Sequence, residues 1–270
     1  MEDILSVLIP FEGIEAISIG GSRALGLASA TSDFDIVLHT RDANCFANND
    51  LIKALEQLGE GCKLTKTPAL ISAEKGGQKF EFFLKDLPSI ERDVEQARQG
   101  KFKWFIKPLF PHGDLSTTPL AHLAHLDCMF DRSGALKRVR DAVTPMPPAL
   151  VTSLLQYFSV QMDITVIHAL KVNKYADLQY LVALSSQFVF FFDILMFALN
   201  DTYPVLEKGG ARLVQRLPKL PEQYADALRV LLPVDGTLSL DEAHTAMQAL
   251  NTQVQTMVKD KLSVMTGVRS

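Results

Sequence analysis

The sequence AISIGGSRALGLASATSDFDIVL, residues 16–38, decides the fold of this chain and contains its most informative residues. An apolar run at 17–19 leads directly into Gly20, Gly21 and Ser22, and a helix-compatible stretch follows at 23–28. Glycines let the backbone approach a ligand closely, and the free amides of a helix start, helped by a serine hydroxyl, favour phosphate oxygens. The pattern therefore predicts a phosphate-binding turn.

A pair of carboxylates follows this turn. Asp33 lies eleven residues after Ser22, and Asp35 lies two residues further on in an expected buried strand at 34–39. Side chains alternate along a strand, so both carboxylates should share one face while Phe34 points into the core. Two neighbouring carboxylates repel each other unless a cation lies between them. Oxygen ligands beside a phosphate-binding turn favour Mg²⁺, with Mn²⁺ as the alternative ion.

The combination of glycine turn, serine, spacing and paired carboxylates resembles the nucleotidyltransferase superfamily that includes DNA polymerase beta. Within it, the sequence is most similar to small bacterial members such as the aminoglycoside adenylyltransferases. The resemblance implies a small mixed sheet and a following helical domain that helps to hold an acceptor. It also implies Mg²⁺-dependent attack by an acceptor hydroxyl on the α-phosphate of a nucleoside triphosphate. Gly20, Gly21, Ser22, Arg23 and Ser32 would then bind the nucleotide.

Such enzymes usually take a third carboxylate from a neighbouring strand, and Glu81 in GQKFEFFLKDL is the natural match. On a strand it would share a face with Lys79 and Phe83. The resemblance makes Glu81 either a third metal ligand, with Asp33 and Asp35, or the general base for the acceptor hydroxyl. Asp86 is the second choice, but its position before Leu87 and Pro88 is more typical of a strand-end turn.

Each of these residues also has an ordinary structural interpretation. The two glycines and the serine could form only a tight turn between strand and helix. Arg23 could be a solvated residue of the first helical turn, and Ser32 a turn residue. Glu81 could be a solubilising charge on an edge strand. The site hypothesis therefore depends on the whole group.

The rest of the chain predicts an α+β fold with an N-terminal mixed β-sheet and flanking helices, followed by an all-α helical bundle. Strands are expected at 17–19, 34–39 and 79–84, and a helix at 49–58. The segment KPLFPHGDLSTTP, residues 107–119, is rich in Pro and Gly and predicts a connection, which places a catalytic domain at 1–113 and a helical domain at 114–270. Helical periodicity continues from there in five segments, at 150–171, 175–200, 204–217, 222–232 and 240–264.

Composition limits the partners and the location of the chain. The net charge of −4 over 270 residues gives no strong nucleic-acid signal. Three separated cysteines supply neither a disulfide framework nor a zinc motif, which suits a cytoplasmic protein. The N-terminus, MEDILSVLIPFEG, lacks the basic leader of a secretory signal. The apolar segment 180–200 is long enough to span a membrane, but Gln187 and Asp193 favour a buried helix of a soluble protein, without a membrane partner.

The leading functional hypothesis is a nucleotidyltransferase that transfers a nucleoside monophosphate, AMP from ATP as the expected case, to a hydroxyl of a small molecule or a macromolecule. The alternative is an antitoxin or regulatory nucleotide-binding module of the same fold that acts with a partner protein. Partner RNases of such modules carry an Arg followed a few residues later by a His on one helix, and no Arg in the second half of this chain is followed by a His at a spacing of five to seven residues. The acceptor and the nucleotide preference cannot be deduced from the sequence.

Overall fold

The structure is a computed structural model, which describes residues 1–67, 70–108, 110–173, 177–206, 209–234, 236 and 238–267. The chain forms two compact units, and each draws on two separate segments. Unit 1 consists of Met1–Gln96 and Pro119–Thr144, and unit 2 consists of Ala97–Thr118 and Pro145–Ser270. A mixed sheet with flanking helices comes first and a helical region follows, which confirms the predicted α+β fold class.

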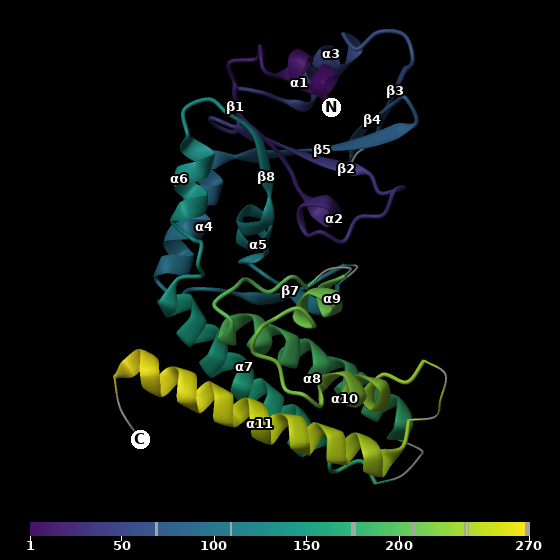
Figure 1. Cartoon of the computed structure of the whole chain (residues 1–270), viewed down its shortest axis with the longest axis vertical. Helices are drawn as coiled ribbons and strands as arrows, with labels where there is room; N and C mark the ends of the chain where they lie inside the picture. Colours follow the sequence, from purple (N-terminus) through teal and green to yellow (C-terminus); the bar gives the residue numbers. More distant parts are fainter. Residues whose placement is uncertain are drawn as a thin grey trace. The chain divides into compact units, whose positions relative to one another are not determined.

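A six-stranded sheet with the order β3-β4-β5-β2-β1-β8 forms the centre of unit 1 (Figure 1). Its strands are β1 (Ile14–Ile19), β2 (Phe34–Thr40), β3 (Cys62–Lys66), β4 (Ile71–Lys75), β5 (Gln78–Asp86) and β8 (Asp127–Asp131). β2 and β5 are parallel, and the other neighbours are antiparallel. The three strands expected from the sequence are thus β1, β2 and β5, and they lie side by side.

Two helices, α1 (Glu2–Leu8) and α3 (Asn48–Glu56), cover one face of this sheet (Figure 1). Ile4 and Leu8 of α1 are buried in one cluster with Leu51 of α3 and with the strand residues Ile36 and Phe82. Phe34, Ile36 and Leu38 of β2 pack in this cluster, so Asp35 and His39 lie on the other face of the strand. The remaining helices of unit 1 are α2 (Gly21–Ala24), α5 (Thr118–His125), α6 (Ala135–Asp141) and most of α4 (Leu87–Arg98).

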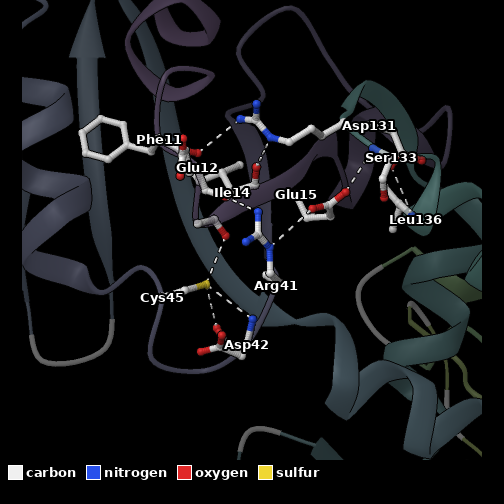
Figure 2. Close-up of polar contacts among 12 residues, drawn as sticks. Phe11, Glu12, Ile14, Glu15, Arg41, Asp42, Cys45, Asp131, Ser133 and Leu136 are labelled. Atoms are coloured by element: carbon white, nitrogen blue, oxygen red, sulfur yellow. Dashed lines mark hydrogen bonds and ion pairs between the residues drawn. The ribbon is translucent and has the colours of Figure 1, made fainter.

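The segment that carries β8 and α6 is attached to β1 by backbone and side-chain contacts (Figure 2). The Arg132 amide donates to the Glu15 carbonyl at 2.8 Å, and the Ser133 amide donates to Glu15 Oε1 at 3.0 Å. The buried Glu15 carboxylate also lies 4.0 Å from Arg41 Nε. Residues 119–144 therefore belong to unit 1, so the structural division differs from the single boundary expected at residue 113.

Unit 2 is built on long helices. Its described elements are β6 (Trp104–Lys107), β7 (Phe110–Leu115), α7 (Pro148–Ala169), α8 (Leu178–Leu199), α9 (Gly210–Val214), α10 (Tyr224–Leu231) and α11 (Leu240–Thr266). α7, α8 and α11 pack against one another, and α10 packs on α8 and α11. The predicted helix at 204–217 is shortened to α9, and the expected start at Tyr175 lies outside the described residues.

Most of the segment expected as a connection, residues 107–119, is structured, and the chain passes from unit 2 to unit 1 at its end, between Thr118 and Pro119. β6 and β7 form an antiparallel hairpin, and the segment ends inside α5. Pro111 is tolerated because a two-stranded ribbon leaves outward amides unpaired. Gly113 has φ +89°, and a Cβ there would lie 2.5 Å from Trp104 Nε1, which donates to the His112 carbonyl. The Pro and Gly residues that suggested a linker thus belong to strand β7, and Gly113 leaves room for the Trp104 side chain of β6.

By length and composition alone, α7 and α8 are both apolar enough to cross a membrane. In unit 2, two thirds of the most apolar window of α8 is buried within the protein, including Phe188 and Phe191. Asp193 of α8 accepts a hydrogen bond of 2.9 Å from the Tyr224 hydroxyl, so this buried carboxyl has a polar neighbour. These contacts are those of a core helix.

Candidate functional site

The glycine turn lies between β1 and α2 and holds the Asp35 carboxylate. The Gly20 amide donates to the Asp35 carbonyl at 2.8 Å. Gly21 has φ +58°, and a Cβ at this position would lie 1.8 Å from Asp35 Oδ2. The predicted phosphate-binding turn and the predicted carboxylate of Asp35 are therefore in direct contact.

The helix after the turn is shorter than expected. It contains Gly21–Ala24, including Ser22, and does not extend over 23–28. Gly26 has φ +64°, a left-handed conformation that ends helical hydrogen bonding. Gly21 and Ser22 therefore lie on a single helical turn, of which Gly21 is in contact with Asp35.

Arg23 organises the loop that leads to Asp33. Its Nη2 donates to the Ser32 carbonyl at 2.5 Å, and its Nε donates to the Asp33 carbonyl at 3.1 Å. Its guanidinium carbon lies 3.7 Å from the centre of the Phe34 ring. The Ser32 hydroxyl accepts a hydrogen bond of 2.9 Å from the Ser29 amide, as in a turn. The Ser32 contact agrees with the turn role considered for this residue, whereas Arg23 binds two backbone carbonyls and is not merely a solvated residue of the first helical turn. The nucleotide contacts of both residues stay predictions.

The three predicted carboxylates come from neighbouring segments. Asp33 lies directly before β2, Asp35 lies inside it, and Glu81 is the register partner of Asp35 on the parallel strand β5. Phe34 packs against the core and stacks on Phe80 at a centroid distance of 5.3 Å. The predicted alternation therefore holds.

Lys79 also belongs to this group, although the sequence predicts only that it shares the face of Glu81. Its Nζ lies 3.1 Å from Asp33 Oδ2 and forms an ion pair with Glu81 Oε1. The hydrogen bond to Glu81, followed by the one to Asp33, raises the pKa of Lys79 above its ordinary value. The lysine stays protonated at neutral pH and links two of the carboxylates.

Asp86, the second choice for a third carboxylate, lies at the opposite end of β5. Its Oδ1 accepts from the Ser89 amide at 2.9 Å and from the Ser89 hydroxyl at 2.7 Å. The Ser89 hydroxyl is the main cause that lowers the pKa of Asp86. As the sequence favoured, Asp86 is a strand-end residue, and here it stabilises the start of α4.

The donor set fits a single divalent cation better than a cage of three carboxylates. Among the described residues, no group of three or more His, Cys, Asp or Glu side chains is arranged to hold a metal ion. Mg²⁺ usually binds through one or two carboxylates together with substrate phosphates. Asp35, in contact with the glycine turn, and the adjacent Asp33 would meet that requirement.

A buried pair lies deeper on the same face of the sheet. Ser18 Oγ and His39 Nε2 are 2.9 Å apart, and both side chains are almost fully buried. Burial lowers the pKa of His39 to about 4. His39 therefore stays neutral and adds no charge to this face of the sheet.

No protein-family model and no curated protein matches the chain. A solved structure of a nucleotidyltransferase-like protein from Exiguobacterium sibiricum is similar, with 11% sequence identity and a TM-score of 0.45. The alignment covers 100% of this chain and 79% of that one. A similarity with so low a TM-score supports no conclusion about function.

Proposed function

We propose that this chain is a divalent-metal-dependent nucleotidyltransferase that transfers a nucleoside monophosphate to a hydroxyl group, with ATP as the expected donor. One observation carries the proposal: the Asp35 carboxylate lies against Gly21 of the glycine turn and in register with Glu81. A triphosphate on the turn would bring its charged oxygens beside the carboxylates. Only a cation can join the two groups, since they carry like charge.

Each residue has a defined task in the proposed reaction. Amides at Gly21 and the Ser22 hydroxyl would bind the β and γ phosphates, while Asp35 with Asp33 would hold a Mg²⁺ ion. That ion would neutralise the phosphate charge that builds up during an in-line displacement. The acceptor oxygen forms a bond to the α-phosphorus as the bond to the pyrophosphate oxygen breaks. Glu81 is the proposed recipient of the acceptor proton.

A second candidate function is a nucleotide-binding module that acts with a partner and does not catalyse transfer. The Lys79 ammonium favours this candidate, because it engages both Asp33 and Glu81. Binding and catalysis differ in their products, so pyrophosphate release separates the two functions.

The experiment is a pyrophosphate-release assay of the purified chain with Mg²⁺ or Mn²⁺ and each of the four nucleoside triphosphates. Acceptors are aminoglycosides, tRNA and whole-cell protein extract, tested separately. We expect release with at least one acceptor, and its loss in Asp35→Asn. Asp141→Asn is the matched control, because this exposed carboxylate of unit 1 pairs with Lys137 on its own helix. Nucleotide binding without release under all these conditions would favour the binding module.

The proposed location is the cytoplasm, with no membrane partner. All three cysteines have free thiols, and α8 is packed as a core helix of unit 2. Fractionation of cells that express the full chain tests this proposal. Recovery mainly in detergent-extracted membranes would contradict it.

A further inference from the structure

Lys79 has an exposed side chain on an interior strand of the sheet, β5. Alternation along β5 places it on the face of Glu81, and the parallel neighbour β2 brings Asp33 to the same place. Its Nζ contacts both carboxylates, 3.1 Å from Asp33 in one case. An ordinary surface ion pair joins one cation to one carboxylate and contributes little.

The two carboxylate partners of Lys79, Asp33 and Glu81, are far apart in the sequence and differ in side-chain exposure. Asp33 and Lys79 are 46 residues apart, so the sheet itself brings them together. The Glu81 side chain is only 19% exposed, so its charge needs a compensating partner. A single ammonium supplies that partner to Glu81 and also lies beside Asp33.

We propose that Lys79 is a built-in cation of the site, which occupies the position between Asp33 and Glu81 and limits the site to a single divalent ion held by Asp35 with Asp33. This role of Lys79 deepens the proposed function and rests on it, because it concerns the same carboxylates. Lys79 is a positioning residue in this scheme. It keeps Glu81 from acting as a metal ligand and holds the Asp33 carboxylate beside β5.

Metal binding, and not only activity, then depends on Lys79. Removing its positive charge would leave the Asp33 and Glu81 carboxylates without the ammonium that lies between them. Such a group attracts a divalent cation more strongly, because like charges on one face are relieved by a cation between them. The protein without nucleotide should therefore bind metal more tightly when Lys79 is replaced by a neutral residue.

The test is a titration of the full chain with Mn²⁺ alone, in which electron paramagnetic resonance measures free Mn²⁺. We expect Lys79→Met to bind Mn²⁺ about tenfold more tightly than the wild type, a change equal to about 1.4 kcal/mol. Lys79→Arg retains the charge and should stay within about twofold, on the same physical grounds. Lys85→Met is the matched control, because Lys85 lies on the same strand and forms no described ion pair.

If Lys79→Met folds poorly, Lys79→Gln replaces it, since the amide retains hydrogen-bond donors for both carboxylates. The inference is overturned if the Mn²⁺ affinity of Lys79→Met or Lys79→Gln rises by less than about threefold over the wild type, or if Lys85→Met raises it equally. So does binding of two Mn²⁺ ions by the wild-type chain. Because the titration needs no turnover, a chain that passes it but releases no pyrophosphate refutes only the proposed function. A chain that transfers nucleotide but fails the titration refutes only the role of Lys79.

Discussion

Gly21 and Asp35 fit each other so closely that a Cβ atom at residue 21 would lie 1.8 Å from Asp35 Oδ2. The same glycine has φ +58°, a conformation that side chains rarely adopt. Two independent constraints, backbone conformation and space, therefore require glycine at this position. Through this contact, the turn determines where the Asp35 carboxylate lies.

We expect Gly21→Ala to abolish transfer and to weaken Mn²⁺ binding, because the new methyl group must displace the Asp35 carboxylate. Left-handed backbone strain adds a loss of stability of roughly 1–2 kcal/mol. Gly76→Ala is a matched control, since Gly76 has φ +60° and a methyl group there would meet no atom within 4 Å. Urea denaturation and Mn²⁺ titration measure the two effects. If both variants lose stability alike and both retain metal binding, the contact between Gly21 and Asp35 has no role in the site.

Asp33→Asn and Asp35→Asn should each remove activity while leaving the fold nearly intact. Each substitution keeps the shape of the side chain and removes a charge that the metal requires, so we expect turnover to fall by about 10²-fold or more. Unfolding free energies should change by less than about 1 kcal/mol, as for exposed ion pairs. Pyrophosphate release and chemical denaturation provide the measurements. Near wild-type turnover with Mg²⁺ in either variant would show that the metal assignment is wrong.

The sequence predicted the part of the site that depends on local pattern. The glycine turn, the alternation of Asp33, Phe34 and Asp35, and the apolar strand around Glu81 are all visible within short windows. Strand alternation has a period of two, so it predicts side-chain faces before any pairing is known. The structure adds that Glu81 is the register partner of Asp35.

The parts that sequence analysis missed depend on distant pairing. β8 joins β1 from far along the chain, and no local signal in Asp127–Asp131 indicates that partner. The role of Lys79 depends on its contact with Asp33, which only the parallel register of β2 and β5 creates. The hairpin of β6 and β7 has the sequence pattern of a linker, because proline and glycine are typical of loops. The need for glycine at residue 113 becomes clear only when strand pairing brings Trp104 beside it.

Glu81→Gln should lower turnover and flatten the acidic limb of its pH profile, with metal and nucleotide binding largely intact. This is the pattern of a general base, and it is expected because Lys79 keeps the Glu81 carboxylate from a metal ion. Steady-state kinetics over pH, together with Mn²⁺ titration, measure both effects. A loss of Mg²⁺ dependence in parallel with the rate would instead assign Glu81 as a metal ligand.

Asp193 gives unit 2 a pH dependence of its own. This carboxyl lies among the apolar side chains of α8, and burial raises its pKa to about 7, partly offset by the hydrogen bond from Tyr224. In the unfolded chain the same group has a pKa of 3.8. Between these values the unfolded chain releases a proton that the folded chain retains, so stability falls as pH rises from about 4 to about 7.

Asp193→Asn should remove this loss, because an amide oxygen still accepts the Tyr224 hydrogen bond but carries no charge. We expect the variant to gain on the order of 1–2 kcal/mol over the wild type at pH 8, and much less at pH 5. Asp226→Asn is the control, since Asp226 is exposed on α10 and pairs with Arg229. Urea denaturation at both pH values measures the difference. An equal effect of Asp193→Asn on the unfolding free energy at pH 5 and pH 8 would show that Asp193 is ionised in the folded protein at both pH values. The hydrogen bond from Tyr224 would then stabilise a charged carboxylate inside the helical unit.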